Sequence, residues 1–165
     1  MNLPALLEDV LRISVAAGDA IMRVYGSADF GVTYKDDESP LTQADLAAHH
    51  IIIDALAALT PELPCLSEEA ADIAYDTRRA WPRYWLIDPL DGTREFVKRN
   101  GEFTVNIALI DNGISILGVV HAPALQVSYL AAQGVGAFRV SGGQRTAIRA
   151  RKTPARPSLV VSKSH

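Results

Sequence analysis

The chain has 165 residues, of which 21% are charged, and a formal net charge of −3. This length suits one domain with a sizeable hydrophobic core, and the balanced charge argues against nucleic-acid binding through a basic surface. The apolar runs are short and interrupted and no secretory leader is recognisable, so we expect a cytoplasmic protein without a membrane span.

The first predicted element is a long amphipathic helix over residues 3–25. Its apolar residues recur at helical spacing, Pro4 lies in the first turn, and Gly26 follows the last periodic residue. Residues 31–40 then change character and carry a run of charged side chains that includes Lys35 and Asp36. Such a run before a proline is typical of a solvated loop.

A second amphipathic helix is opened by residues 39–45, and its apolar face extends to Leu59. Thr42 and Asp45 have the spacing of a capping box, which explains them without any chemistry. His49 and His50 follow on this helix. They lack the i, i+4 spacing of paired metal ligands, so we expect surface or packing histidines.

A short strand is predicted in residues 64–69, and it ends in Glu68 and Glu69. Two acids at the end of a strand are the arrangement by which a sheet edge presents ligands, and the alternative is an exposed acidic turn. Residues 70–82 are polar and indicate a surface excursion before the next strand.

The central stretch begins with three apolar residues, 85–87, which predict a short buried strand. Asp88 and Asp91 follow, and two carboxylates three residues apart across a turn can both face one hard cation. Gly92 permits close approach of the backbone to an anion, and a helix starting at Thr93 would point its N–H groups at the same place. The alternative is an ordinary turn in which Asp88 is a helix N-cap.

The second half of the chain predicts consecutive strands joined by tight turns. Turn residues occupy 111–113 and 141–143, and the strands are expected at 103–110, 114–121, 126–132, 136–140 and 146–150. This pattern favours an antiparallel sheet with the two early helices on one face, so the predicted fold class is α+β.

Two domains are predicted. Residues 1–150 form a metal-binding α+β domain, and residues 151–165 form a linker and the first strand of a truncated second domain. The linker is basic and contains proline. An unpaired last strand can be covered by a partner, which makes a homodimer one possible assembly.

Residues 88–93, Asp-Pro-Leu-Asp-Gly-Thr, resemble the Asp-Pro-(Ile/Leu)-Asp-Gly-Thr signature of the inositol monophosphatase superfamily. Residues 98–106, Lys-Arg-Asn-Gly-Glu-Phe-Thr-Val-Asn, and residues 162–165, Ser-Lys-Ser-His, resemble its bisphosphate nucleotidase branch. The resemblance runs along nearly the whole chain. It implies a sugar-phosphatase-like layered fold, with two N-terminal helices on a large antiparallel sheet and a second α/β domain that is largely missing here.

The resemblance also implies two or three Mg²⁺ ions. Their ligands would be Glu68, Asp88, Asp91 and the carbonyl of Leu90. Oxygen ligands suit Mg²⁺ better than Zn²⁺, and the sequence has no Cys/His cluster at ligand spacing. The mobile loop of the family would correspond to residues 31–40. Lys35 and Asp36 could there serve a third metal or a substrate gate, but a solvated loop is the favoured interpretation.

Catalytic roles are implied for three residues. Asp45 would orient the hydroxyl of Thr93, and this hydroxyl and Glu68 would orient the attacking water. Substrate contacts are implied for four residues: Gly92, Thr93, Ser162 and His165.

The implied activity is the Mg-dependent and lithium-sensitive release of the 3'-phosphate from 3'-phosphoadenosine 5'-phosphate, and also from its 5'-phosphosulfate. The implied partner is therefore a phosphorylated small-molecule nucleotide. One alternative is an inositol monophosphatase or a fructose-1,6-bisphosphatase-type sugar phosphatase. A second is an inactive metal- or phosphate-binding module, because the later Trp-Asp-x-Ala-Ala-Gly segment of the family is absent. The absence of this segment has three explanations: a fragment of a longer enzyme, a chain that pairs with a missing half, or a truncated relative without turnover. The first is favoured.

Overall fold

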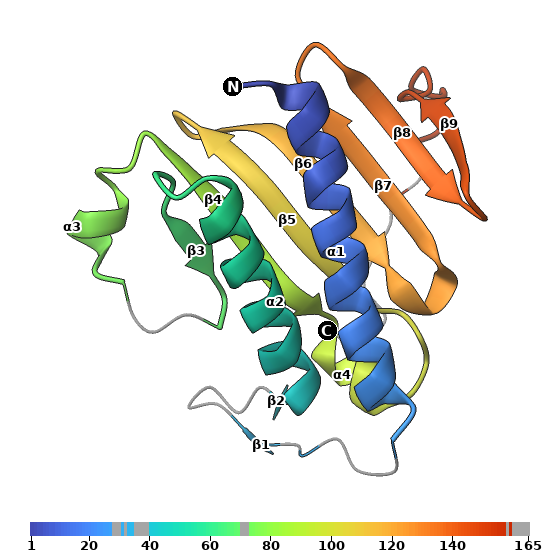
Figure 1. The fold of residues 1–165 in the computed structure, drawn as a ribbon. Coiled ribbons are helices and arrows are strands. Elements are labelled where there is room, and N and C mark those ends of the chain that lie inside the picture. Colours follow the sequence, from blue (N-terminus) through green and yellow to red (C-terminus); the bar gives the residue numbers. More distant parts are fainter. Residues whose placement is uncertain (28–30, 32, 35–39, 70–72, 158, 160–165) are drawn as a thin grey trace.

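The computed structural model describes residues 1–165 except 28–30, 32, 35–39, 70–72, 158 and 160–165. The described residues form two layers, a seven-stranded sheet and two long helices on one of its faces (Figure 1). Four residues discussed above lie outside the described residues: Lys35, Asp36, Ser162 and His165. The α+β fold class is confirmed.

Both predicted helices are present. Helix α1 spans Leu3–Tyr25, and the side chain of Asn2 caps it by accepting the N–H of Ala5. Helix α2 spans Gln43–Leu59 and begins with the predicted capping box. Each helix buries one face, at the i, i+3 and i+4 spacing that predicted it. None of the described helices is long and apolar enough to span a membrane.

The sheet orders its strands as they follow in the chain, from β3 to β9. The strands are β3 (Cys65–Ser67), β4 (Arg83–Asp91), β5 (Thr104–Asp111), β6 (Ile114–Ala122), β7 (Val127–Ala132), β8 (Gly136–Ser141) and β9 (Gln144–Ile148). The remaining elements are β1 (Thr33–Tyr34), β2 (Pro40–Leu41), α3 (Tyr75–Arg78), α4 (Thr93–Val97) and a 3₁₀ turn at Pro123–Leu125.

The predicted antiparallel sheet has one parallel neighbour, at its edge. Strand β3 pairs with β4 in parallel, while the other neighbours in this sheet pair antiparallel. The long connection that contains α3 returns the chain to the end of the sheet where β3 began, and a parallel neighbour requires such a crossover. The tight turn at Asn112 and Gly113 has positive φ at both residues, as hairpin turns of the I′ type require.

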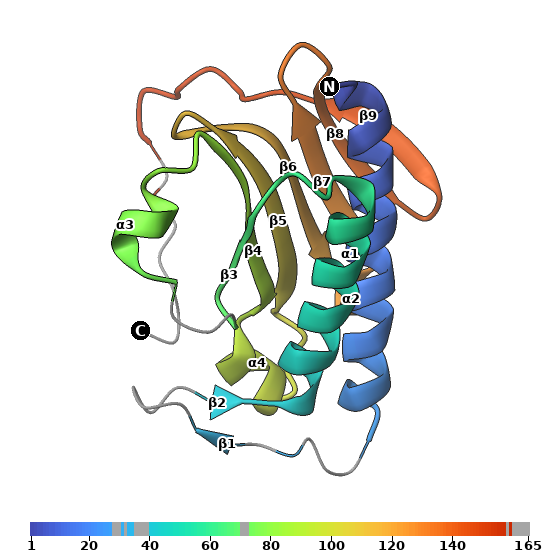
Figure 2. The ribbon, with the colours of Figure 1, turned by 60° about the vertical axis from the view of Figure 1, so that its left-hand side comes forward.

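The buried strand predicted at residues 85–87 is buried on one face only. Trp85 and Ile87 lie in the core, whereas Leu86 points to the opposite face and is 43% exposed. Helices α1 and α2 lie on the same side of the sheet, and the chain after β9 passes toward the other side (Figure 2). Strand β4 therefore has one face in the core and one face on the side without the long helices, which we call the open face.

Specific contacts hold the helices on the sheet. Buried Trp85 donates its indole N–H to the hydroxyl of Thr60, 2.9 Å away, at the end of α2. The ring of His121 on β6 packs so closely on α1 that a Cβ at Gly18 would lie 2.6 Å from it. The same ring shares a 2.8 Å hydrogen bond with Ser128 of β7.

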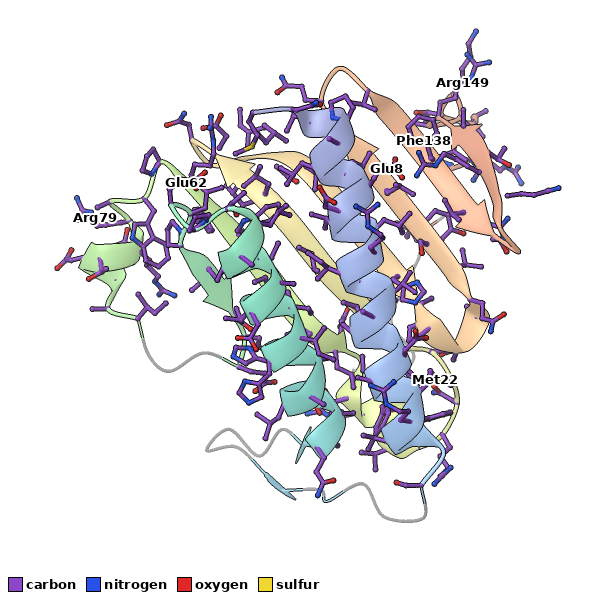
Figure 3. The ribbon with its side chains drawn as sticks, viewed as in Figure 1. Glu8, Met22, Glu62, Arg79, Phe138 and Arg149 are labelled. Carbon is purple, nitrogen blue, oxygen red and sulfur yellow. The ribbon has the colours of Figure 1, made fainter. Side chains whose placement is uncertain are left out.

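At the other end of the sheet, an ion pair links α1 to β9. Arg145 donates two hydrogen bonds to the carboxylate of Glu8, at 2.6 and 2.8 Å. The guanidinium also lies 5.3 Å from the centre of the Phe138 ring, and Figure 3 shows Glu8 and Phe138 beside each other. Because this pair is partly exposed, its contribution to stability is small, about 0–1 kcal/mol.

Candidate functional site

The site is built around the end of β4. Asp88 pairs with Asn106 and Asp91 pairs with Thr104, and the register shifts between these two pairs. This irregularity lies near the end of β4, which stops at Asp91, and Gly92 then leads into α4. Asp88 lies on the open face, because it alternates with the inward-facing Ile87.

Gly92 is the residue that makes this turn possible. Its backbone is left-handed, with φ 92° and ψ 38°, and it is the N-cap of α4. A Cβ here would come within 2.9 Å of the carbonyl oxygen of Glu102, so both conformation and space require glycine. The alternative interpretation of Asp88 as a helix N-cap is excluded, because Gly92 holds that position.

Asp88 is the most perturbed acid of the site. Burial raises its pKa from 3.8 to about 7, with further contributions from the charges of Glu68 and Asp91 and from a hydrogen bond with Glu68. Its buried Oδ1 atom has no hydrogen-bond partner among the described residues. A buried carboxylate oxygen that lacks a donor and faces like charges is what a bound cation would satisfy.

The other two carboxylates lie near Asp88 and are exposed. Glu68 follows β3, and its N–H donates to the carbonyl of Ile87 at 3.0 Å, which holds it beside β4. Asp91 accepts a hydrogen bond from the side-chain amide of Asn106 at 3.2 Å. Within the described ranges, no three His, Cys, Asp or Glu side chains already converge as a metal site. The donors are neighbours, but their side chains do not form a closed ligand shell.

Asp45 joins helix α2 to the start of α4. Its buried carboxylate accepts hydrogen bonds from the N–H and hydroxyl of Thr42 and from the hydroxyl of Thr93, the last at 3.1 Å. The Thr93 hydroxyl is also 3.1 Å from the carbonyl of Leu90. Burial raises the pKa of Asp45, and these hydrogen bonds oppose the effect. Asp45 thus both caps a helix and contacts Thr93.

Sequence reasoning missed two polar contacts of this region. Asn106 accepts from the hydroxyl of Thr104 while it donates to Asp91. The sequence feature that could have predicted this contact is the polar pair Thr104 and Asn106, which lies on one face of an otherwise apolar strand. His49, expected to be a surface or packing residue, is half-buried and shares a 2.9 Å hydrogen bond with Ser67. Burial lowers the pKa of His49.

A cleft of about 770 Å³ extends from Glu68, Asp88 and Asn106 over the open face. Its lining combines polar groups with apolar side chains and includes Glu68, Asp88, Asn106, Arg78, Leu86 and Val120. A concave apolar surface with a few convergent polar groups is the usual form of a small-molecule site.

The sequence profile of the inositol monophosphatase family matches residues 6–165. This chain belongs to the inositol monophosphatase family. It is 54% identical over 162 residues to the 3'(2'),5'-bisphosphate nucleotidase CysQ of Salmonella typhimurium, and 42% identical over 161 residues to CysQ of Buchnera aphidicola. Each alignment covers 97% of this chain but only 64% and 60%, respectively, of the relative.

Solved structures of this family share the fold. CysQ from Bacteroides thetaiotaomicron is 41% identical, with a TM-score of 0.72 over 84% of this chain and 49% of that protein. An inositol monophosphatase from Thermotoga maritima is 31% identical, with a TM-score of 0.75 over 90% of this chain and 54% of that protein. The predicted layered architecture is therefore confirmed for the part of the family fold that this chain covers.

Proposed function

We propose that the whole protein is a 3'(2'),5'-bisphosphate nucleotidase that hydrolyses the 3'-phosphate of 3'-phosphoadenosine 5'-phosphate to AMP and phosphate. The observation that carries this proposal is the 54% identity, over 97% of the chain, to relatives of that name. The run at residues 98–106 supports the nucleotide branch over a sugar phosphatase. We extend the proposal to the 5'-phosphosulfate of the same nucleotide, which offers the same 3'-phosphate.

We further propose that the site works with Mg²⁺, bound as two or three ions. Glu68, Asp88, Asp91 and the carbonyl of Leu90 would hold them, since all four offer oxygen donors. The support from this chain is the unpartnered buried oxygen of Asp88 and its raised pKa. When bound, Mg²⁺ supplies charge neutralisation at the phosphoryl group and lowers the pKa of a water molecule.

The residues of the chain then orient the reactants. The carboxylate of Asp45 accepts a hydrogen bond from the Thr93 hydroxyl, so the oxygen lone pairs of Thr93 are free to accept a hydrogen bond from the attacking water. Glu68, which lines the cleft, would accept a hydrogen bond from the same water and help to orient it. Gly92 and Thr93 begin α4, where N–H groups lack intrahelical partners and can donate to phosphate oxygens. Contacts of residues 162 and 165 with the nucleotide stay a prediction.

We also propose the domain division at residue 150, with the second domain covering the open face. The chain spans 64% of the length of its CysQ relatives. Leu86, Val120 and Tyr129 are 43%, 42% and 45% exposed, and the segment after β9 leads toward that side (Figure 2). A cytoplasmic location and a homodimer remain predictions.

The test is phosphate release by the full-length protein with Mg²⁺, using the nucleotide, its phosphosulfate, inositol monophosphate and fructose-1,6-bisphosphate as substrates. We expect the nucleotides to be preferred by at least about 100-fold in kcat/KM. Asp91→Asn should lower the rate by about 10- to 100-fold, and lithium should inhibit. The matched control is Asp76→Asn on α3, whose carboxylate is 90% exposed.

Preference for inositol monophosphate would refute the nucleotidase assignment. Binding of Mg²⁺ and nucleotide without phosphate release would instead identify a binding module.

A further inference from the structure

Glu68 lies directly after a short edge strand of the sheet. It follows β3, an edge strand of three residues that pairs only with β4 within the described sheet. One backbone hydrogen bond, from its N–H to the carbonyl of Ile87, continues the pairing to Glu68 itself. A short edge strand opens more readily than a central one. Contacts that hold the end of β3 therefore help to position Glu68, in addition to the hydrogen bond between its side chain and Asp88.

Helix α2 supplies such a contact. Asp45 and His49 are four residues apart and therefore lie on the same face of the helix. Asp45 reaches Thr93, in the segment that follows Asp91, and His49 reaches Ser67, next to Glu68. Ser67 is only 5% exposed, and its hydroxyl lies 2.9 Å from Nδ1 of His49. Two side chains one turn apart thus tie one rigid helix to both acidic segments of the site.

We propose that His49 is a positioning residue, which fixes the Glu68 end of β3 through Ser67. This inference rests on the proposed function, because it takes Glu68 as a metal ligand. Without the imidazole, the buried hydroxyl of Ser67 loses its partner and the end of β3 relaxes to find another. The Glu68 carboxylate then samples more positions, and it binds a cation less tightly.

The experiment measures Mg²⁺ binding to the full-length protein by calorimetry. The variants are His49→Ala, Ser67→Ala, the double variant and His49→Asn. The control is His50→Ala, which removes an exposed ring lying edge-on to His49 but leaves the bond between His49 and Ser67 in place. His49→Ala and Ser67→Ala should each weaken Mg²⁺ binding about fivefold, as expected for one lost hydrogen bond. The double variant should be no weaker than either single one, because both remove the same contact.

Two further results are expected. Asparagine offers a polar group at the position of Nδ1, so His49→Asn should recover most of the affinity. In phosphate release, His49→Ala should raise the Mg²⁺ concentration for half-maximal activity while the KM for nucleotide stays unchanged. Hydrogen exchange of residues 65–69 in the metal-free protein should become faster in His49→Ala and remain unchanged in His50→Ala.

A lower melting temperature with unchanged Mg²⁺ binding would make His49 a packing residue and overturn the inference, as would additive effects of the two alanine variants. Failure of the proposed function looks different. If the wild-type protein releases no phosphate but Mg²⁺ binding and exchange follow the expected pattern, only the nucleotidase assignment fails.

Discussion

Replacing Asp88 by asparagine should stabilise the metal-free protein at alkaline pH. The folded structure raises the pKa of this carboxyl from 3.8 to about 7, chiefly through burial and then through the charges of Glu68 and Asp91. Between these two pKa values the unfolded chain has lost its proton and the folded chain still holds it. The free energy of unfolding therefore falls as pH rises from about 4 to about 7.

The size of the effect follows from the same values. A pKa change from 3.8 to about 7 corresponds at full strength to about 4 kcal/mol. Because Asp88 is partly exposed and shares charge with two neighbouring acids, solvent screening reduces this to about 1–2 kcal/mol. Asparagine is neutral at every pH, so the variant should exceed the wild type by this amount at about pH 8 and match it at about pH 4.

Urea unfolding with a chelator present measures this difference. It is followed by tryptophan fluorescence, to which buried Trp85 contributes. Adding Mg²⁺ at about pH 8 should then stabilise the wild type and have less effect on Asp88→Asn. The control Asp76→Asn should change stability by less than about 0.5 kcal/mol at any pH. An Asp88→Asn variant with the same pH dependence as the wild type would refute the electrostatic account of this site.

Three further substitutions test the packing around the site. Gly92→Ala should lower the free energy of unfolding by about 2–3 kcal/mol, because φ is positive and the added Cβ meets a carbonyl oxygen 2.9 Å away; a loss below about 0.5 kcal/mol in denaturant titration would contradict this. Gly18→Ala should cost about 1–3 kcal/mol by displacing the ring of His121, and the loss should shrink in a His121→Ala background; equal losses in both backgrounds would exclude the contact. Trp85→Phe should cost about 2 kcal/mol, because it leaves the hydroxyl of Thr60 without its donor; a thermal melt that does not shift would contradict this.

Local patterns in the sequence determined most of the elements. Helices α1 and α2 follow from apolar periodicity and from caps, and the hairpin at Asn112 and Gly113 follows from residues that tolerate positive φ. The segment at residues 88–93 stood out because two acids, a glycine and a threonine follow an apolar strand and resemble a family signature. These features depend on residues that are close together in the sequence, so they can be predicted from a single amino-acid sequence.

Contacts between distant segments were decided only by the tertiary structure. The parallel pairing of β3 and the exposure of Leu86 depend on which strand lies alongside and on whether a second layer covers the sheet. The periodicity of apolar residues along the sequence predicts neither the pairing partner of a strand nor the covering of a sheet face. The unpartnered oxygen of Asp88 and the bond between His49 and Ser67 likewise arise where elements meet. Burial and electrostatic coupling are properties of the packed chain, and for that reason they become visible only once the segments are brought together in space.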